Sequence, residues 1–363
     1  MRFDDNPAMD AWLRASVVVA RGAHALFQDG TDDCWKRTYQ PFDLVQTGTA
    51  QVRPEGRQHV WHAGVTALDA MVDWLPTIKQ YNLAQSDDPE VLVFGSRIDG
   101  MTNGIKHNFF ANISGMNVYA GLFAYFQTPA HFANEFTPWV EFEKFKLVFV
   151  AGEVMTRDAM QRVVDYAKQG GRIVIVGNAG RYCVQEPGSR DLLIKMLHNL
   201  PGQTNIKYLP QASMQAPSPG CAPEAEFSTD RKQTLSILDW ANIKRPLLAV
   251  DGQGNLDTGF ECMLRRENED TVYAGVYRRY VRLPKSRWYE QIMHIDANRQ
   301  RWGEKHTTVQ LSDLPAGQYE LSQIHRNNQS LGIHTVGQDG ILRWQTNTSV
   351  TGQLQIYKVT KTQ

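Results

Sequence analysis

The chain has 363 residues, of which 42% are hydrophobic and 21% charged, and this is the composition of an ordinary soluble globular protein. Single hydrophobic cores rarely grow beyond about 250–300 residues, so this length predicts two or three domains. Lys+Arg and Asp+Glu both number 38, and the resulting net charge of zero gives no reason to expect a nucleic acid or a membrane as partner.

The chain start and the cysteines point to a cytoplasmic protein. No apolar run reaches the roughly 20 residues of a membrane-spanning helix, and Met1–Asp5 lacks the pattern of a signal peptide. The four cysteines stand far apart and form no CxxC pair, so neither a metal site nor a disulfide framework is expected. We therefore predict no metal and no other cofactor.

The first elements are a helix, a short strand and a second, longer helix. Residues 7–22 have apolar side chains at helical spacing, and the short apolar run Ala23–Phe27 follows. Residues 38–57 are rich in Gly, Pro and Thr, which is typical of a linker. The next helix is predicted over residues 58–81, with a kink or an end at Pro76.

The clearest pattern in the chain is a strand–helix–strand unit. Two apolar runs, Leu147–Ala151 and Arg172–Gly177, enclose a segment whose apolar residues recur at helical spacing. Thr156 can cap the start of this helix, and Gly170–Gly171 supply the left-handed residue that ends it. Such a unit predicts parallel strands that are covered on both faces.

Further elements extend this α/β domain on both sides. We expect a strand that begins with Val91–Phe94, a helix over residues 105–126 that is interrupted near Gly115, and a helix over Asp191–Leu200. His131–Phe136 is a candidate strand. Residues 211–228 are rich in Pro, Ala and Ser and predict a domain boundary or a long loop.

Beyond about residue 245 the pattern changes to short alternating segments separated by turn residues. Regularly spaced strands of this kind predict an antiparallel β-sandwich. The segments are Glu261–Arg266, Val272–Arg279, Thr307–Leu311, Gln318–Gln323, Ile341–Gln345 and Gln353–Val359.

Three stretches resemble the C-terminal half of family-42 β-galactosidases: ARGAHALFQDG (Ala20–Gly30), HVWHAGVTALDAMVDWL (His59–Leu75) and the segment Phe142–Arg181. The resemblance implies the last βα unit of a (β/α)8 barrel and a linker over residues 1–57. It implies a long helix and a flavodoxin-like, class I glutamine amidotransferase-like α/β domain over 58–228. A β-sandwich over 229–363 would follow. By resemblance, the α/β domain would assemble the protein into a homo-oligomer, a trimer.

The same resemblance leaves this chain without a catalytic residue. The acid/base and nucleophile glutamates of the family lie on earlier barrel strands, for which this chain has no counterpart. Retaining hydrolysis of a β-galactoside or a related glycoside needs two carboxyls roughly 5–5.5 Å apart. The polar residues after Ala23–Phe27 are expected to be solvated, with a sugar-contacting loop as the alternative. In that loop Gln28 and Asp29 would bond hydroxyls and Trp35 would stack on a pyranose; the candidate residues are Gln28, Asp29, Asp32, Asp33 and Trp35.

Two features of the α/β domain could carry other chemistry. Amidotransferase activity needs a cysteine on a tight strand-to-helix turn, but Cys183 lies several residues beyond the predicted strand, so a buried or loop thiol is expected. Gly177–Gly180 could approach a phosphate at a helix N-terminus. No glycine-rich nucleotide motif accompanies these residues, and an ordinary turn is expected.

Outside that domain, His59 and His62 are one helical turn apart and could share a ligand, although surface or interface positions are expected. A basic run with interleaved aromatics begins at Arg278 and is compatible with a nucleic acid or a glycan. A strand edge defended by Arg and Lys explains it as well. Sugar stacking and ordinary packing remain the alternatives for three aromatic residues, Trp288, Tyr289 and Trp302.

The sequence thus leads to one main hypothesis and two alternatives. The chain is predicted to be the non-catalytic C-terminal portion of a glycoside hydrolase, with carbohydrate as ligand if the barrel is completed. The first alternative is a stand-alone scaffold that binds a glycan or a protein. The second is an enzyme with a site at the C-terminal edge of the parallel sheet, where open α/β folds usually bind ligands.

Overall fold

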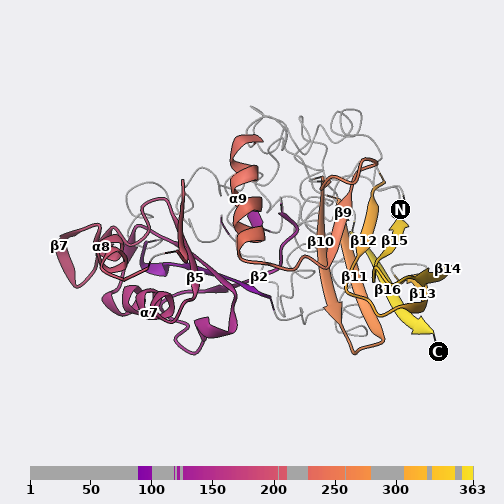
Figure 1. Cartoon of the computed structure of the whole chain (residues 1–363), viewed down its shortest axis with the longest axis horizontal. Helices are drawn as coiled ribbons and strands as arrows, with labels where there is room; N and C mark the ends of the chain where they lie inside the picture. The colour runs from indigo at the N-terminus through magenta and orange to yellow at the C-terminus, as the bar shows by residue number, and fades with distance from the viewer. Residues whose placement is uncertain are drawn as a thin grey trace, which may run out of the picture. The chain divides into compact units, whose positions relative to one another are not determined.

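The computed structural model describes residues 89–99, 118, 121–122, 126–202, 204–210, 228–257, 259–278, 306–324, 329–347 and 354–362. Among them, the residues up to Arg245 form one compact unit and those from Pro246 form another. We call these the α/β unit and the two-sheet unit. The chain is therefore mixed α/β, with one five-stranded parallel sheet and separate antiparallel sheets (Figure 1).

The parallel sheet of the α/β unit has the strand order β2-β1-β3-β5-β8. Its strands are β1 (Val91–Gly95), β2 (Ala130–Ala133), β3 (Leu147–Ala151), β5 (Arg172–Val176) and β8 (Ile206–Leu209). All neighbouring strands run parallel. In sequence order, β2 pairs on one side of β1, and β3, β5 and β8 then follow one after another on its other side. The carboxyl ends of β1 and β3 consequently flank a topological switch point.

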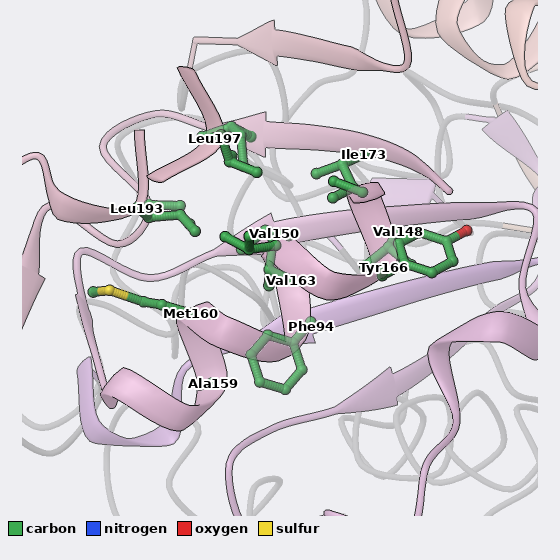
Figure 2. Close-up of a cluster of buried hydrophobic side chains, with 14 of the residues drawn as sticks. Phe94, Val148, Val150, Ala159, Met160, Val163, Tyr166, Ile173, Leu193 and Leu197 are labelled. Carbon is green, nitrogen blue, oxygen red and sulfur yellow. The ribbon is translucent and has the colours of Figure 1, made fainter. Parts of the chain in front are cut away.

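Both faces of this sheet are covered, as the continuous apolar strands predict. On one face, Phe94, Val148 and Ile173 pack with residues of α7 (Arg157–Lys168) and α8 (Leu192–His198). Figure 2 shows this cluster, in which Met160 and Val163 of α7 are grouped with Val148 and Val150 of β3. On the other face, alternate strand residues pack with α9 (Ser228–Trp240) and with three helical residues, Val118, Leu122 and Phe126.

The local signals of the strand–helix–strand unit are confirmed. The Thr156 side chain accepts a hydrogen bond from the Ala159 amide at 3.1 Å and so caps α7. Gly170 follows the helix with a φ of +87°, which glycine adopts without the Cβ penalty. The apolar residues at helical spacing in α7, Met160, Val163, Val164 and Ala167, are all buried.

The structure also contains a small sheet that the sequence did not predict. It consists of β4 (Val154–Met155), β6 (Tyr182–Cys183) and β7 (Glu186–Arg190), in that order. β4 and β6 run parallel, and β6 and β7 form an antiparallel hairpin. These strands are too short, and β7 too polar, to produce a recognisable period in the sequence.

The two-sheet unit contains a five-stranded and a three-stranded antiparallel sheet, ordered β10-β11-β16-β13-β14 and β15-β12-β9. Buried residues of both sheets form one cluster, so the sheets pack face to face. Six strands match the predicted segments, and β9 and β14 were missed. The strands are β9 (Leu247–Val250), β10 (Phe260–Arg266), β11 (Thr271–Arg278), β12 (Thr308–Leu311), β13 (Gly317–Gln323), β14 (Gln329–Val336), β15 (Leu342–Gln345) and β16 (Leu354–Thr362).

Two further differences concern the end of β2 and the end of the α/β unit. β2 ends at Ala133 instead of Phe136, because Asn134 and Thr137 form a turn. The sequence placed a boundary at 228/229, whereas α9 packs on the parallel sheet and the α/β unit ends at Arg245. The predicted barrel remnant and linker over residues 1–57 lie outside the described residues. Within the described part of the chain, no helix is long and apolar enough to cross a membrane.

Candidate functional site

Polar side chains gather at the C-terminal edge of the parallel sheet, near the switch point between β1 and β3. Ser96 directly follows β1, Glu135 lies in the loop after β2, and Glu153 follows β3. Carboxyl ends of parallel strands meet at one edge of a sheet, so these residues lie on the side where open α/β folds bind ligands. This edge is the candidate functional site.

The Ser96 hydroxyl is the centre of the cluster. It is within hydrogen-bond distance of Glu135 Oε1 and lies 2.5 Å from the carbonyl oxygen of Val154. It also accepts a hydrogen bond from the Asp99 amide at 3.1 Å. The second carboxylate oxygen of Glu135 accepts from the Arg97 amide at 2.8 Å, which fixes the carboxylate in its place. Only 7% of Ser96 is exposed, so the hydroxyl connects the loops after β1, β2 and β3 inside the fold.

Gly152 brings the β3 loop into direct contact with Ser96. A Cβ on Gly152 would lie 2.6 Å from Ser96 Cβ and 3.1 Å from Ser96 N, distances at which a neighbour must move. The φ of Gly152 is +112°, which side-chain-bearing residues rarely adopt. The Asp99 carboxylate accepts a hydrogen bond from the Val154 amide at 3.1 Å. The missing side chain of Gly152 therefore lets the end of β3 lie directly against Ser96.

A second group of charges follows on the β5 side of the edge. The Arg181 guanidinium lies 3.3 Å from Glu153 Oε1 and 3.7 Å from Asp191 Oδ1. It also lies over the ring of Tyr182, 5.4 Å from the ring centroid. About a third of the Arg181 side chain is exposed. Because the group is paired with two carboxylates, it holds the β5 loop and α8 together and offers little positive charge to an anionic ligand.

The predicted alternative of a phosphate at Gly177–Gly180 is not supported by the geometry. The Gly177 amide donates to the Leu209 carbonyl at 2.7 Å, and the Gly180 amide donates to the Gly152 carbonyl at 2.8 Å. The Ala179 amide donates to the Val176 carbonyl at 3.3 Å. An anion-binding loop needs amides directed at the ligand, and these three are used within the fold.

Cys183 lies on β6, away from any strand-to-helix turn. Its side chain is buried, and its Sγ is 3.5 Å from the Gln185 side-chain oxygen. The expectation of a buried thiol is confirmed. A second buried thiol, Cys262, lies on β10 of the two-sheet unit, and desolvation by burial raises its pKa. A thiol with a raised pKa is a poor nucleophile near neutral pH.

The loop after β2 carries two large exposed aromatics. We call residues 134–140 the aromatic loop; within it 59% of Phe136 and 72% of Trp139 are exposed. Asn134 and Thr137 brace the loop: the Phe136 amide donates to Asn134 Oδ1 at 2.8 Å, and the Thr137 amide donates to the Asn134 carbonyl at 3.0 Å. The Val140 amide donates to the Thr137 carbonyl at 3.2 Å. The aromatic side chains thus stand on a hydrogen-bonded turn.

Arg162 of α7 attaches the end of this loop to the core. Its Nη2 donates to the Val140 carbonyl at 2.7 Å, and its guanidinium lies 4.7 Å from the centroid of the Phe142 ring. Desolvation by burial lowers the pKa of Arg162, and the nearby Glu143 carboxylate raises it. An arginine remains charged in either case, so it supplies a permanent hydrogen bond and a cation–π contact to this segment.

The residues that the sequence suggested as ligand contacts are not part of this site. The candidate sugar-contacting residues Gln28, Asp29, Asp32, Asp33 and Trp35 lie outside the described residues, as do His59, His62, Trp288, Tyr289 and Trp302. Sequence reasoning missed Ser96, Glu135 and Trp139. Their place in the sequence could have identified Ser96 and Glu135, because polar residues that closely follow apolar parallel strands lie at the ligand-binding edge of the sheet. In the described segments, no three His, Cys, Asp or Glu side chains are placed to hold a metal ion.

Comparison with known proteins gives structural likeness only. No family profile and no curated sequence matches the chain. Among solved structures, an exo-carrageenase GH42 from Bacteroides ovatus matches 85% of this chain and 34% of its own length, with 9% identity and a TM-score of 0.44. A catalytic mutant of Gan42B, a GH42 β-galactosidase from G. stearothermophilus, matches 85% of this chain with 8% identity and a TM-score of 0.46.

The β-galactosidase from Bacillus circulans sp. alkalophilus matches 77% of this chain with 12% identity and a TM-score of 0.44. The chain spans 45% of the length of both β-galactosidases. At this identity the likeness concerns the arrangement of elements alone. The chain thus has a structural resemblance to GH42 enzymes over less than half of their length.

Proposed function

We propose that this chain is a non-catalytic portion of a glycoside-hydrolase-related protein, in which the α/β unit serves assembly and the two-sheet unit is an accessory β-sandwich. The α/β unit would be a flavodoxin-like domain. Its strand order supports this, because order 2-1-3-4-5 along the chain is the order of flavodoxin-like folds. The resemblance of Phe142–Arg181 to the trimerisation domain of family-42 β-galactosidases supports the assembly role.

The contact of Gly152 with Ser96 carries the non-catalytic part of the proposal. In flavodoxin-like folds a ligand enters at the switch point between the first and third strands. Here the Gly152 backbone fills that position against Ser96 Cβ, and the Ser96 hydroxyl is bonded to the neighbouring loops. A ligand at this point would have to separate β1 from β3. The groups at the edge thus support a structural role.

Two measurements on the complete chain test the proposal. An assay with aryl β-galactosides should show no more hydrolysis than buffer alone. Hydrolysis that is lost when a residue of this chain is replaced would contradict the non-catalytic assignment. Analytical ultracentrifugation over a wide concentration range should show an oligomer. A chain that stays monomeric at all concentrations would remove the assembly role while leaving the fold assignment intact.

A second candidate function rests on the Ser96–Glu135 pair. A serine hydroxyl bonded to a fixed carboxylate is the arrangement of a nucleophile and its general base, which suits acyl transfer. An alkyl fluorophosphonate probe tests this candidate directly. Labelling of the native chain that disappears in Ser96→Ala would favour the enzyme, and absence of labelling at Ser96 would favour the structural role.

A further inference from the structure

The aromatic loop contributes no buried side chain to the core of the α/β unit. It lies between two buried residues, Ala133 at the end of β2 and Phe142, which is 3% exposed. Between them, no residue from 134 to 140 is buried. A segment with few buried apolar contacts opens locally at a low cost in free energy, so polar contacts have to hold this loop in place.

These polar contacts attach the loop at its two ends. At the far end, Arg162 Nη2 donates to the Val140 carbonyl at 2.7 Å. At the near end, the Glu135 carboxylate contacts the Ser96 hydroxyl and accepts from the Arg97 amide at 2.8 Å. The hydrogen bonds of Asn134 and Thr137 lie within the loop and shape its turn without attaching it. Glu135 is therefore the residue that holds the first half of the loop against the edge of the sheet.

The contact of Glu135 with Ser96 is a contested one. A serine hydroxyl has a single proton to donate, and two acceptors lie beside it: Glu135 Oε1 and the Val154 carbonyl oxygen, the latter at 2.5 Å. The Asp99 amide already donates to the same hydroxyl at 3.1 Å. When the proton is donated to Val154, the hydroxyl offers none to Glu135. The near end of the loop is consequently held less firmly than the far end.

We propose that the aromatic loop is a gate over the Ser96 hydroxyl, which opens when Glu135 releases Ser96 and Arg97 while Arg162 retains the end of the loop. In the closed state described above, only 7% of Ser96 is exposed. Opening uncovers a hydroxyl and a backbone amide at the edge where open α/β folds bind ligands. This inference goes beyond the proposed function, because it requires neither assembly nor catalysis.

The first test is limited chymotrypsin digestion of the complete native chain, with cleavage after Phe136 and Trp139 followed by mass spectrometry. Cleavage within a folded protein tracks the population of the open form, and Glu135→Ala should raise its rate at least about tenfold. Glu135→Gln should be cleaved no faster than the native chain. Its amide oxygen can accept from Arg97 and its amide nitrogen can donate to Ser96, whose proton is then left to Val154.

Glu141→Ala is the matched control. It also removes one carboxylate from this part of the surface, but Glu141 is exposed and paired with Lys144 at 2.8 Å. Its cleavage rate should equal that of the native chain. Hydrogen exchange of β3 and β5 should be equally slow in all variants, because Glu135 lies outside the core.

The second test measures access to position 96. Ser96→Cys is combined with Glu135→Ala and, separately, with Glu135→Gln, and alkylation of the new thiol by iodoacetamide is followed by peptide mass spectrometry. Alkylation should be at least about tenfold faster in the Glu135→Ala background, where the loop is released.

Three results would overturn the gate. The first is equal cleavage of Glu135→Ala and the native chain, or equal acceleration by Glu141→Ala. The second is faster cleavage accompanied by faster exchange of β3 and β5, which would mean that the whole unit unfolds. The third is equal alkylation of residue 96 in both backgrounds, which would mean that the loop does not cover Ser96.

Discussion

Gly152→Ala tests whether the β1 and β3 loops are joined as closely as the structure indicates. The new Cβ would lie 2.6 Å from Ser96 Cβ, and the residue would have to keep a φ of +112°. Overpacking of this kind costs about 1–3 kcal/mol, and a side chain at such a φ costs about 1–3 kcal/mol more. We therefore expect the α/β unit to lose roughly 2–6 kcal/mol of stability.

Hydrogen–deuterium exchange with peptide resolution measures this loss, because the two-sheet unit serves as an internal reference. Exchange of β1, β3 and β5 amides should accelerate by roughly 30-fold or more, since 2 kcal/mol corresponds to about that factor. Peptides from β11 and β16 should not change. Gly188→Ala is the control, because a Cβ there meets nothing within 4 Å.

A second substitution, at Ser96, separates the two contributions to this loss of stability: overpacking against Ser96 and the positive φ of residue 152. In a Ser96→Gly background the 2.6 Å contact with Ser96 Cβ is absent, so Gly152→Ala should destabilise the α/β unit by less, while the cost of the positive φ remains. Unchanged exchange in Gly152→Ala alone would refute the close approach. An equal cost in both backgrounds would refute the contact with Ser96 as its cause.

Three further predictions concern the same unit. Ser96→Ala removes the hydroxyl that contacts Glu135, Val154 and the Asp99 amide, and it should destabilise the α/β unit by about 1–3 kcal/mol, measured by the same exchange. Met160→Ala removes a fully buried side chain of α7 and should cost about 2–5 kcal/mol, again without effect on β11 or β16. Burial raises the pKa of Tyr166 to about 12, while the unfolded tyrosine titrates near 10. The folded state thus keeps a proton that the unfolded state loses, so stability from this group is present below pH 10 and lost as pH rises to 12. The loss is on the order of 2 kcal/mol and should be absent in Tyr166→Phe, as urea titrations at pH 9 and pH 11.5 would show.

The sequence predicted the strand–helix–strand unit well because its signals are local. Thr156 caps a helix whose buried residues recur along one stripe, and the apolar runs on either side have the length of buried strands. β14 was missed for a local reason as well. In β14 the pairing shifts opposite Leu321, where Gly332 has a φ of +99°, and this irregularity interrupts the alternation on which a strand prediction depends.

The candidate site could not be predicted in the same way. Ser96 and Glu135 are 39 positions apart, and Ser96 and Val154 are 58 apart. Nothing in the surrounding residues of any of them shows that they meet. Only the order in which the strands pair brings the ends of β1, β2 and β3 to one edge, and only the missing side chain of Gly152 lets those ends touch.

The sequence by itself determined the class of this protein: a parallel α/β region with buried strands, followed by antiparallel strands separated by turns. Hydrophobic period, helix caps and turn residues act over a few positions, so a linear pattern is enough to specify them. The tertiary structure decided which strands are neighbours, that α9 belongs to the parallel sheet, and that the Phe136 and Trp139 side chains remain exposed. These features depend on contacts between distant segments, and burial of a side chain is settled only when the whole core has formed.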